Sequence, residues 1–294
     1  MTRPDPDLRR TWLFGPGADL AAHQHMLDSG AGALILDLED FTPPSRRDEA
    51  RGNLSGFIAG CRKHGRLAVV RINQLEDDGM IDLTAAMKAR PDAVAYPMAE
   101  QPRQIEALST ALADLETANN LPQGSTEIVP VCETALGVVN VRSLAEASDR
   151  IHCAILGSED LAADLCAERG SDAVELDHAR RRFVVECRAA RIEPVDAPYT
   201  YADTDGLQRE ARYARRLGYR GKALVRPDHA AVLNKVFTPQ PDDLALARDI
   251  IAGFEAARSK GEDRALVNGL WVEVPAYRNA CRIVERAKRL GIVR

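Results

Sequence analysis

The chain has 294 residues, 45% of them hydrophobic, and 39 basic against 44 acidic residues give a formal net charge of −5. This composition is typical of a globular protein with a large core and lacks the basic excess typical of nucleic-acid binding. No apolar run approaches the roughly 20 residues that span a bilayer, and the first ten residues lack the apolar core of a signal peptide. We therefore expect a soluble, cytoplasmic protein without nucleic-acid or membrane partners.

Eight short apolar runs alternate with longer helical segments. Strand–helix alternation favours a parallel sheet, and eight repeats favour a closed (β/α)8 barrel over an open doubly wound sheet. No GxGxxG follows the first run, which weakens a dinucleotide-binding alternative. The predicted strands are Thr11–Gly17, Ala33–Asp40, Arg66–Asn73, Ala93–Glu100, Glu127–Thr134, Ile151–Asp160, Ile192–Tyr199 and Gly221–Pro227. The clearest predicted helices between them are Gln101–Asn119, Leu176–Ala190 and Gly206–Leu217.

The chain continues beyond the eighth strand. Asp242–Ser259 reads as an amphipathic helix, Lys260–Asn268 as a polar loop, and Pro275–Leu290 as a last helix that begins at a proline. We therefore predict a catalytic barrel over residues 1–240 and a C-terminal helical extension over residues 241–294, which caps the barrel or packs on a neighbouring subunit.

Charged residues gather at the carboxyl ends of the predicted strands, where barrel enzymes carry their active sites. Because side chains two apart share a face of a strand, Asp37 and Glu39 align with Ile35 and should point into the barrel mouth. By the same count Arg71 aligns with Val69. The other acids at strand ends are Asp40, Glu100, Glu133, Glu159, Asp160 and Asp196.

Several carboxylates at one mouth would repel one another, and a bound cation would offset this repulsion. Oxygen ligands suit Mg²⁺, which keeps several waters and takes one or two protein carboxylates. The histidines show no zinc-type spacing. We therefore predict a divalent cation, Mg²⁺ or alternatively Mn²⁺, among these strand-end carboxylates.

Several motifs in order resemble the citrate lyase β-subunit-like branch of the HpcH/HpaI aldolase superfamily, which includes malyl-CoA and citramalyl-CoA lyases. The resemblance covers most of the chain. The motifs are RTWLFGPG at residues 10–17, LDLED at 36–40, VRIN at 70–73, ETALG at 133–137, GSEDL at 157–161, LGYRGK at 217–222 and NKVFTP at 234–239.

The resemblance implies a role for individual residues. Glu133 and Asp160 would coordinate Mg²⁺, with Asp37 and Glu39 ordering its waters, and Arg71 would clamp a substrate oxygen. Two arginines match basic positions of the family and would meet the coenzyme A thioester: Arg10 and Arg47. Relatives also suggest a homo-oligomer, a trimer or its multiple.

Three positions depart from the family's pattern. Met98 replaces a lysine, Arg226 a histidine, and Glu273 an aspartate that in relatives reaches a neighbouring subunit and transfers a proton. Glutamate keeps the carboxylate, so Glu273 remains a candidate catalytic residue. These changes bear on the substrate rather than on the metal pair.

We therefore predict a Mg²⁺-dependent carbon–carbon lyase that cleaves or condenses a 3-hydroxyacyl-CoA, such as citramalyl-CoA or malyl-CoA, through a thioester enolate. The alternatives are an acyl-CoA thioesterase on the same scaffold and a citrate lyase β subunit acting on an acyl-carrier-protein thioester. A pyruvate aldolase that uses no coenzyme A and a catalytically silent barrel are further alternatives.

Overall fold

The computed structural model describes residues 3–293 and divides into two compact units, one ending at Val236 and the other beginning at Phe237. In the first unit eight parallel strands close in sequence order, with β8 paired to β1. The predicted (β/α)8 barrel is thereby confirmed. The strands are β1 (Thr11–Pro16), β2 (Ala33–Asp37), β3 (Leu67–Arg71), β4 (Ala93–Tyr96), β5 (Glu127–Cys132), β6 (Cys153–Leu156), β7 (Glu193–Asp196) and β8 (Gly221–Leu224).

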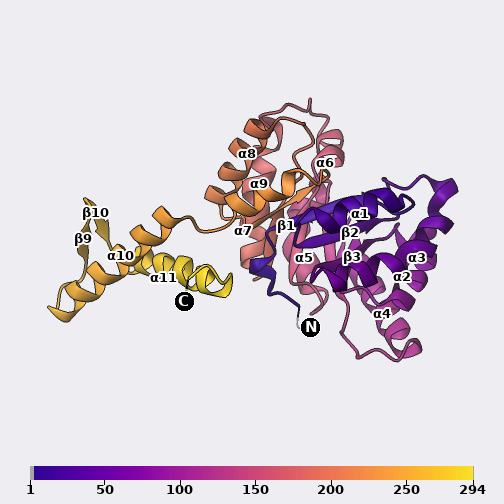
Figure 1. Cartoon of the computed structure of the whole chain (residues 1–294), viewed down its shortest axis with the longest axis horizontal. Coiled ribbons are helices and arrows are strands. Elements are labelled where there is room, and N and C mark those ends of the chain that lie inside the picture. Colours follow the sequence, from indigo (N-terminus) through magenta and orange to yellow (C-terminus); the bar gives the residue numbers. More distant parts are fainter. Residues whose placement is uncertain (1–2, 294) are drawn as a thin grey trace. The chain divides into compact units, whose positions relative to one another are not determined.

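Helices surround the strands of this unit (Figure 1). Each predicted strand is present, but each ends one to four residues earlier than the sequence suggested. Four of the acids predicted at strand ends therefore lie on the loops above the strands, and two more begin α6. The four are Glu39, Asp40, Glu100 and Glu133, and the two are Glu159 and Asp160. The helices are α1 (Leu20–Asp28), α2 (Arg47–Lys63), α3 (Met80–Ala89), α4 (Pro102–Ala118), α5 (Ala135–Glu146), α6 (Glu159–Asp164), α7 (Asp177–Ala189), α8 (Thr204–Leu217) and α9 (His229–Val236).

The barrel interior is filled by side chains from all eight strands, among them Ile35, Val69, Val131 and Ile155, each at most 2% exposed. Because strand side chains alternate, the residues two positions further on continue this inward-facing row at the carboxyl end. Asp37, Arg71 and Glu133 are in this position.

The C-terminal unit contains α10 (Pro241–Ser259) and α11 (Val274–Arg289), which pack on each other around Phe254 and Val272. The predicted loop at 260–268 is wrong in part, because β9 (Ala265–Val267) pairs with β10 (Leu270–Val272) as an antiparallel hairpin. Asn268 and Gly269 form its turn with φ of 51° and 79°. Asn-Gly is a strong signal for such a two-residue turn, so the sequence did contain the hairpin.

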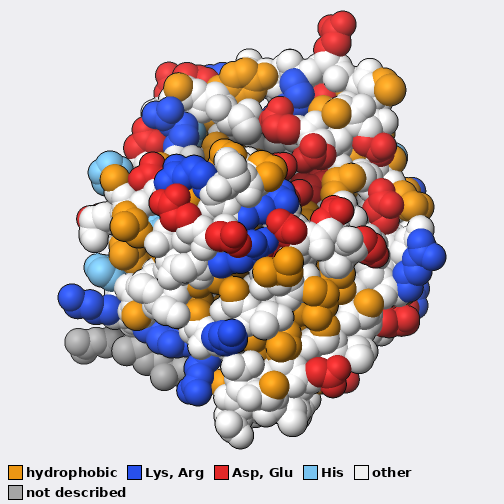
Figure 2. Space-filling model, turned by 90° about the vertical axis from the view of Figure 1, so that its right-hand side faces the viewer, with side chains coloured by type: hydrophobic (Ala, Val, Ile, Leu, Met, Phe, Trp, Pro, Cys, Tyr) orange, Lys and Arg blue, Asp and Glu red, His pale blue; other side chains and the backbone are white. Residues whose placement is uncertain are grey.

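None of the helices formed by residues 3–293 is both long and apolar enough to cross a membrane. On the face drawn in Figure 2, acidic and basic side chains are interspersed.

Candidate active site

A cavity of about 180 Å³ opens at the carboxyl ends of the barrel strands. Its lining comes from β1, β3, β5 and β6, from the loops after β2, β5, β6, β7 and β8, and from the start of α6. One part of the wall is charged, with Asp40, Arg71, Glu133, Glu159 and Asp160. The other is apolar and consists of Phe14, Phe41, Val131, Ile155, Leu156, Pro198 and Val225.

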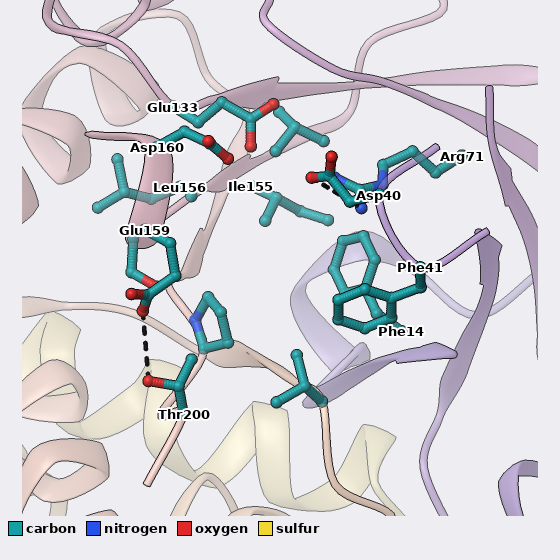
Figure 3. Close-up of a pocket in the computed structure, with 15 residues that line it drawn as sticks. Phe14, Asp40, Phe41, Arg71, Glu133, Ile155, Leu156, Glu159, Asp160 and Thr200 are labelled. Atoms are coloured by element: carbon teal, nitrogen blue, oxygen red, sulfur yellow. Dashed lines mark hydrogen bonds and ion pairs between the residues drawn. The ribbon is translucent and has the colours of Figure 1, made fainter. Parts of the chain in front are cut away.

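Glu133 and Asp160 lie side by side at the cavity wall, opposite Arg71 and Asp40 (Figure 3). Glu133 follows β5, whereas Asp160 lies in the first turn of α6, two residues beyond Ser158. Burial raises the pKa of Glu133 to about 7, and burial and the nearby Asp40 carboxylate raise that of Asp160. The charged form of each carboxylate is thus less stable in this cavity than it would be in water, and a bound cation would offset this cost.

Gly157 allows Glu133 to come this close to α6. A Cβ at position 157 would lie 2.4 Å from Glu133 Cβ and 2.8 Å from its Oε2. Glu133 Oε1 accepts a 2.8 Å hydrogen bond from the Met98 backbone N–H. The glutamate is therefore fixed from two sides, with Oε1 already bonded.

Arg71 pairs with Asp37, its register partner on the adjacent strand β2. Its Nε donates to Asp37 Oδ1 at 2.8 Å and its Nη2 to Oδ2 at 2.5 Å. Asp37 also accepts from the backbone N–H groups of Glu39 and Phe41. Asp37 is fully buried. Its hydrogen bonds hold Arg71 and the loop after β2, so Asp37 anchors the arginine.

Glu39 lies on the other side of the guanidinium. Its Oε2 is 2.7 Å from Arg71 Nη1, but without hydrogen-bond geometry. Burial raises the pKa of Glu39 to about 8 despite the opposing charge of Arg71. The side chains of Asp37, Glu39 and Arg71 do meet, as the strand alternation predicted. Of the three, only Arg71 lines the cavity, so the role of Asp37 and Glu39 in ordering the metal's waters stays a prediction.

Other predicted residues lie elsewhere. Arg10 directly precedes β1, at the end of the barrel opposite the cavity, so the structure does not bring it to the site. Arg47 begins α2, which follows β2, and its Nη1 donates at 3.1 Å to Asp78 in the segment after β3. Glu273 is exposed before α11 in the C-terminal unit, and Arg226 pairs with Asp228.

Asp196 corrects our expectation for the seventh strand. Val195 points into the barrel, so Asp196 points outward, where it accepts from Arg180 and from Lys222 Nζ at 2.6 Å. All three side chains are buried, at most 2% exposed. Asp196 is therefore part of a buried ion-pair cluster behind the barrel wall.

Two residues at the rim were not singled out from the sequence. Thr200, on the loop after β7, donates to Glu159 Oε1 at 3.2 Å and so joins the loops above β6 and β7 (Figure 3). Arg169 also donates to Glu159 Oε1, from Nε and Nη2 at 3.2 Å each. No local motif marks either residue, because neither contact falls at a spacing that a helix or a strand would set.

The residues fit a divalent cation held by two carboxylates. Within residues 3–293, no group of three or more His, Cys, Asp and Glu side chains is arranged to hold a metal by itself. Mg²⁺ commonly takes only one or two protein carboxylates and fills its other positions with water and substrate oxygens. Four acids and one arginine line the cavity, so the wall also has the negative excess that a cation needs.

A closed barrel with paired carboxylates at its carboxyl end is the architecture of a metal-assisted barrel enzyme. Residues 10–227 match the HpcH/HpaI aldolase/citrate lyase family, and the chain belongs to it. This confirms the resemblance drawn from the motifs. The chain is accordingly an enzyme of the lyase class.

Relatives cover nearly the whole chain. The citrate lyase subunit beta of Leuconostoc mesenteroides is 33% identical, over 97% of this chain and 95% of that protein. An L-malyl-CoA/beta-methylmalyl-CoA lyase of Cereibacter sphaeroides is 29% identical, over 98% of both chains. Among solved structures, protein CitE of Mycobacterium tuberculosis in complex with magnesium, acetoacetate and coenzyme A superposes with a TM-score of 0.77 at 26% identity, covering 95% of this chain and 98% of that one.

Proposed function

We propose that the protein is a Mg²⁺-dependent carbon–carbon lyase acting on a 3-hydroxyacyl-CoA, with Glu133 and Asp160 as the metal ligands. The observation that carries this proposal is the pair of destabilised carboxylates facing Arg71 across one cavity. Relatives named as malyl-CoA lyases and a neighbour holding magnesium and coenzyme A support it.

The metal would act as a Lewis acid on the hydroxyl and carboxyl oxygens of the substrate. Asp37 holds Arg71 by two hydrogen bonds, which leaves three of the five guanidinium N–H groups for Glu39 and for a substrate oxygen. Arg71 is then placed to stabilise the negative charge that develops on the thioester oxygen as the C–C bond breaks.

Two proton transfers complete the cleavage. The hydroxyl proton passes to a carboxylate as the carbonyl forms and the C–C electron pair moves to the thioester enolate. Asp40 is the best placed acceptor, because it lines the cavity, is 57% exposed and lies only 3.5 Å from Arg71 Nη2. The enolate carbon then takes a proton, for which we propose Glu273 of a neighbouring copy in a homo-oligomer.

The cavity favours a substrate with a small apolar substituent. Arg71 is the one cation among its described lining residues, and the wall away from the carboxylates is apolar. Arg71 and the metal would each bind one anionic group, so the additional carboxylate of a citryl group would be buried without a partner. This supports malyl- or citramalyl-type thioesters over citryl thioesters.

The test is a panel of malyl-, citramalyl-, citryl- and 3-hydroxy-3-methylglutaryl-CoA with Mg²⁺, in which every product is identified. We expect acetyl-CoA and a 2-oxo acid in equal amounts, and loss of this activity in Glu133→Ala and Asp160→Ala. Free CoA without acetyl-CoA or propionyl-CoA would instead identify a thioesterase. Activity only on an acyl-carrier-protein thioester would identify a citrate lyase β subunit.

A second readout separates metal binding from catalysis. Mg²⁺ that binds the folded state should raise the unfolding midpoint of the wild type. Asp160→Asn removes the charge with little change in shape, so its midpoint should no longer respond to Mg²⁺. Full Mg²⁺-dependent activity in this variant would refute the assigned ligands.

A further inference from the structure

A second cavity, of about 290 Å³, lies at the amino ends of the strands, opposite the candidate active site. Leu67, which opens β3, and Asp92, which directly precedes β4, fix its position. Its remaining wall is formed by Arg3 and Pro4 near the amino terminus and by Arg62, Gly65 and Arg66 at the end of α2. Its volume is close to the roughly 300 Å³ at which small-molecule sites begin.

The cavity has an excess of positive charge. Three arginines and one carboxylate line it. The carboxylate is already engaged, because Asp92 Oδ2 accepts a 2.8 Å hydrogen bond from the Ala68 N–H and its Oδ1 lies 3.7 Å from Arg3 Nε. The next acid, Glu127, accepts from both terminal nitrogens of Arg9 at 2.6 and 2.9 Å and from Arg3 Nη1 at 3.3 Å. Arg3 is therefore already engaged, and the uncompensated charge of the cavity lies on Arg62 and Arg66.

Arg66 has a buried donor without an acceptor in the described part of the chain, and this observation carries the inference. Its Nε is buried and has no hydrogen-bond partner among the described residues, and no carboxylate of residues 3–293 forms an ion pair with it. A buried donor of a charged group without an acceptor costs about 1–3 kcal/mol or more. Arg62 is only partly engaged, since its Nη2 donates to the Arg90 carbonyl.

We propose that this cavity, defined by Arg3, Arg62 and Arg66, is a binding site for the oxyanion of a small metabolite. The guanidinium fork matches the oxygens of a phosphate or a carboxylate, and an oxyanion would give Arg66 Nε its missing acceptor. Such a ligand would join the amino-terminal segment to the turn between α2 and β3. The site is therefore separate from the proposed lyase centre and would stabilise the fold or regulate it.

The first experiment is calorimetric titration of the metal-free full chain with inorganic phosphate and, separately, with acetate at fixed ionic strength. We expect saturable binding of one of them and a rise of the unfolding midpoint with its concentration. The tighter probe identifies the group as phosphate or carboxylate. Absence of saturable binding of both would refute the proposal.

Variants locate the binding. Arg66→Gln should weaken it about tenfold or more, the equivalent of one charged hydrogen bond. Arg62 is exposed, so Arg62→Gln should leave the fold intact. It should weaken binding of the oxyanion less than Arg66→Gln does. Lys63→Gln removes the same charge from the same turn without lining the cavity, and should change affinity less than twofold. Binding unaffected by Arg66→Gln, or equally affected by Lys63→Gln, would overturn the assignment.

Discussion

The backbone N–H of Met98 donates a 2.8 Å hydrogen bond to Oε1 of Glu133, across the loops that follow β4 and β5. Met98 does so from a left-handed conformation, with φ of 48°, which costs a residue with a side chain about 1–2 kcal/mol. Gln104 supports this conformation, since its Nε2 donates to the Met98 carbonyl at 3.2 Å. Because Oε1 is bonded to this amide, Oε2 is the oxygen left for a cation.

Gly157 is the other constraint on Glu133, and Gly157→Ala should disturb the metal pair. The new Cβ would displace the Glu133 side chain, so we expect Mg²⁺ affinity to fall about 10- to 100-fold, as for residues that orient metal ligands. The Mg²⁺ affinity is measured from the rise of the unfolding midpoint as Mg²⁺ is added. The matched control is Gly52→Ala in α2, where a Cβ meets nothing within 4 Å and Mg²⁺ affinity should stay the same. Equal Mg²⁺ affinity in both variants would contradict the proposed role of Glu133.

Arg71→Lys tests the arginine anchored by Asp37. Lysine keeps the charge but cannot form the paired hydrogen bonds to both Asp37 oxygens. We expect kcat/KM for the preferred thioester to fall about 100-fold, which corresponds to about 2.7 kcal/mol. Arg142→Lys, in an exposed pair with Glu146, should leave kcat/KM unchanged. Wild-type kcat/KM in Arg71→Lys would show that a single positive charge suffices there.

Strand alternation made most of this site predictable. Once Ile35, Val69 and Val131 are placed in the interior, counting two residues onward brings Asp37, Arg71 and Glu133 to the mouth. The same rule applied to Val195 turns Asp196 outward, so a position at the end of a strand does not by itself place a side chain in the mouth.

Other features depend on contacts that no local pattern carries. The bond to Glu133 comes from the Met98 backbone, so the identity of residue 98 does not reveal it. Arg10 belongs to a motif that runs into β1, and only the direction of that strand shows that the arginine lies at the opposite end from the cavity. The strands end before their predicted bounds for a similar reason. Hydrogen bonding to the two neighbouring strands stops before the apolar sequence pattern does.

Lys222→Met tests the structural role of the cluster around Asp196. Lys222 is fully buried and donates to Asp196 and Glu210, so its loss leaves buried carboxylates with less compensation. We expect the free energy of unfolding in urea to fall by about 3 kcal/mol, the usual cost of breaking a buried pair. Because Lys222 faces away from the cavity, kcat/KM of the folded variant should change less than twofold. Exposed Lys63→Met serves as the control for stability, and a loss of kcat at unchanged stability would place Lys222 in the active site instead.

Glu116 should give the fold a distinct acid dependence. This fully buried carboxylate accepts from both terminal nitrogens of Arg150, at 2.8 and 2.7 Å, and from the N–H groups of Gly124 and Thr126. Burial alone would raise its pKa, but Arg150 and the two amides lower it from 4.5 to about 2. The folded state therefore binds this proton more weakly than the unfolded state, and stability is lost as the pH falls.

The loss should begin as the pH falls toward about 4.5 and be complete only below about pH 2, amounting to about 3 kcal/mol. Urea unfolding at several pH values, compared between the wild type and Glu116→Gln, isolates this contribution. The difference in free energy of unfolding should be constant above pH 5 and shrink toward pH 2, because glutamine does not titrate. Glu146→Gln, which removes the exposed partner of Arg142, should show a small difference that does not depend on pH in this way. A difference for Glu116→Gln that stayed constant down to pH 2 would mean that the carboxylate titrates alike in the folded and unfolded states.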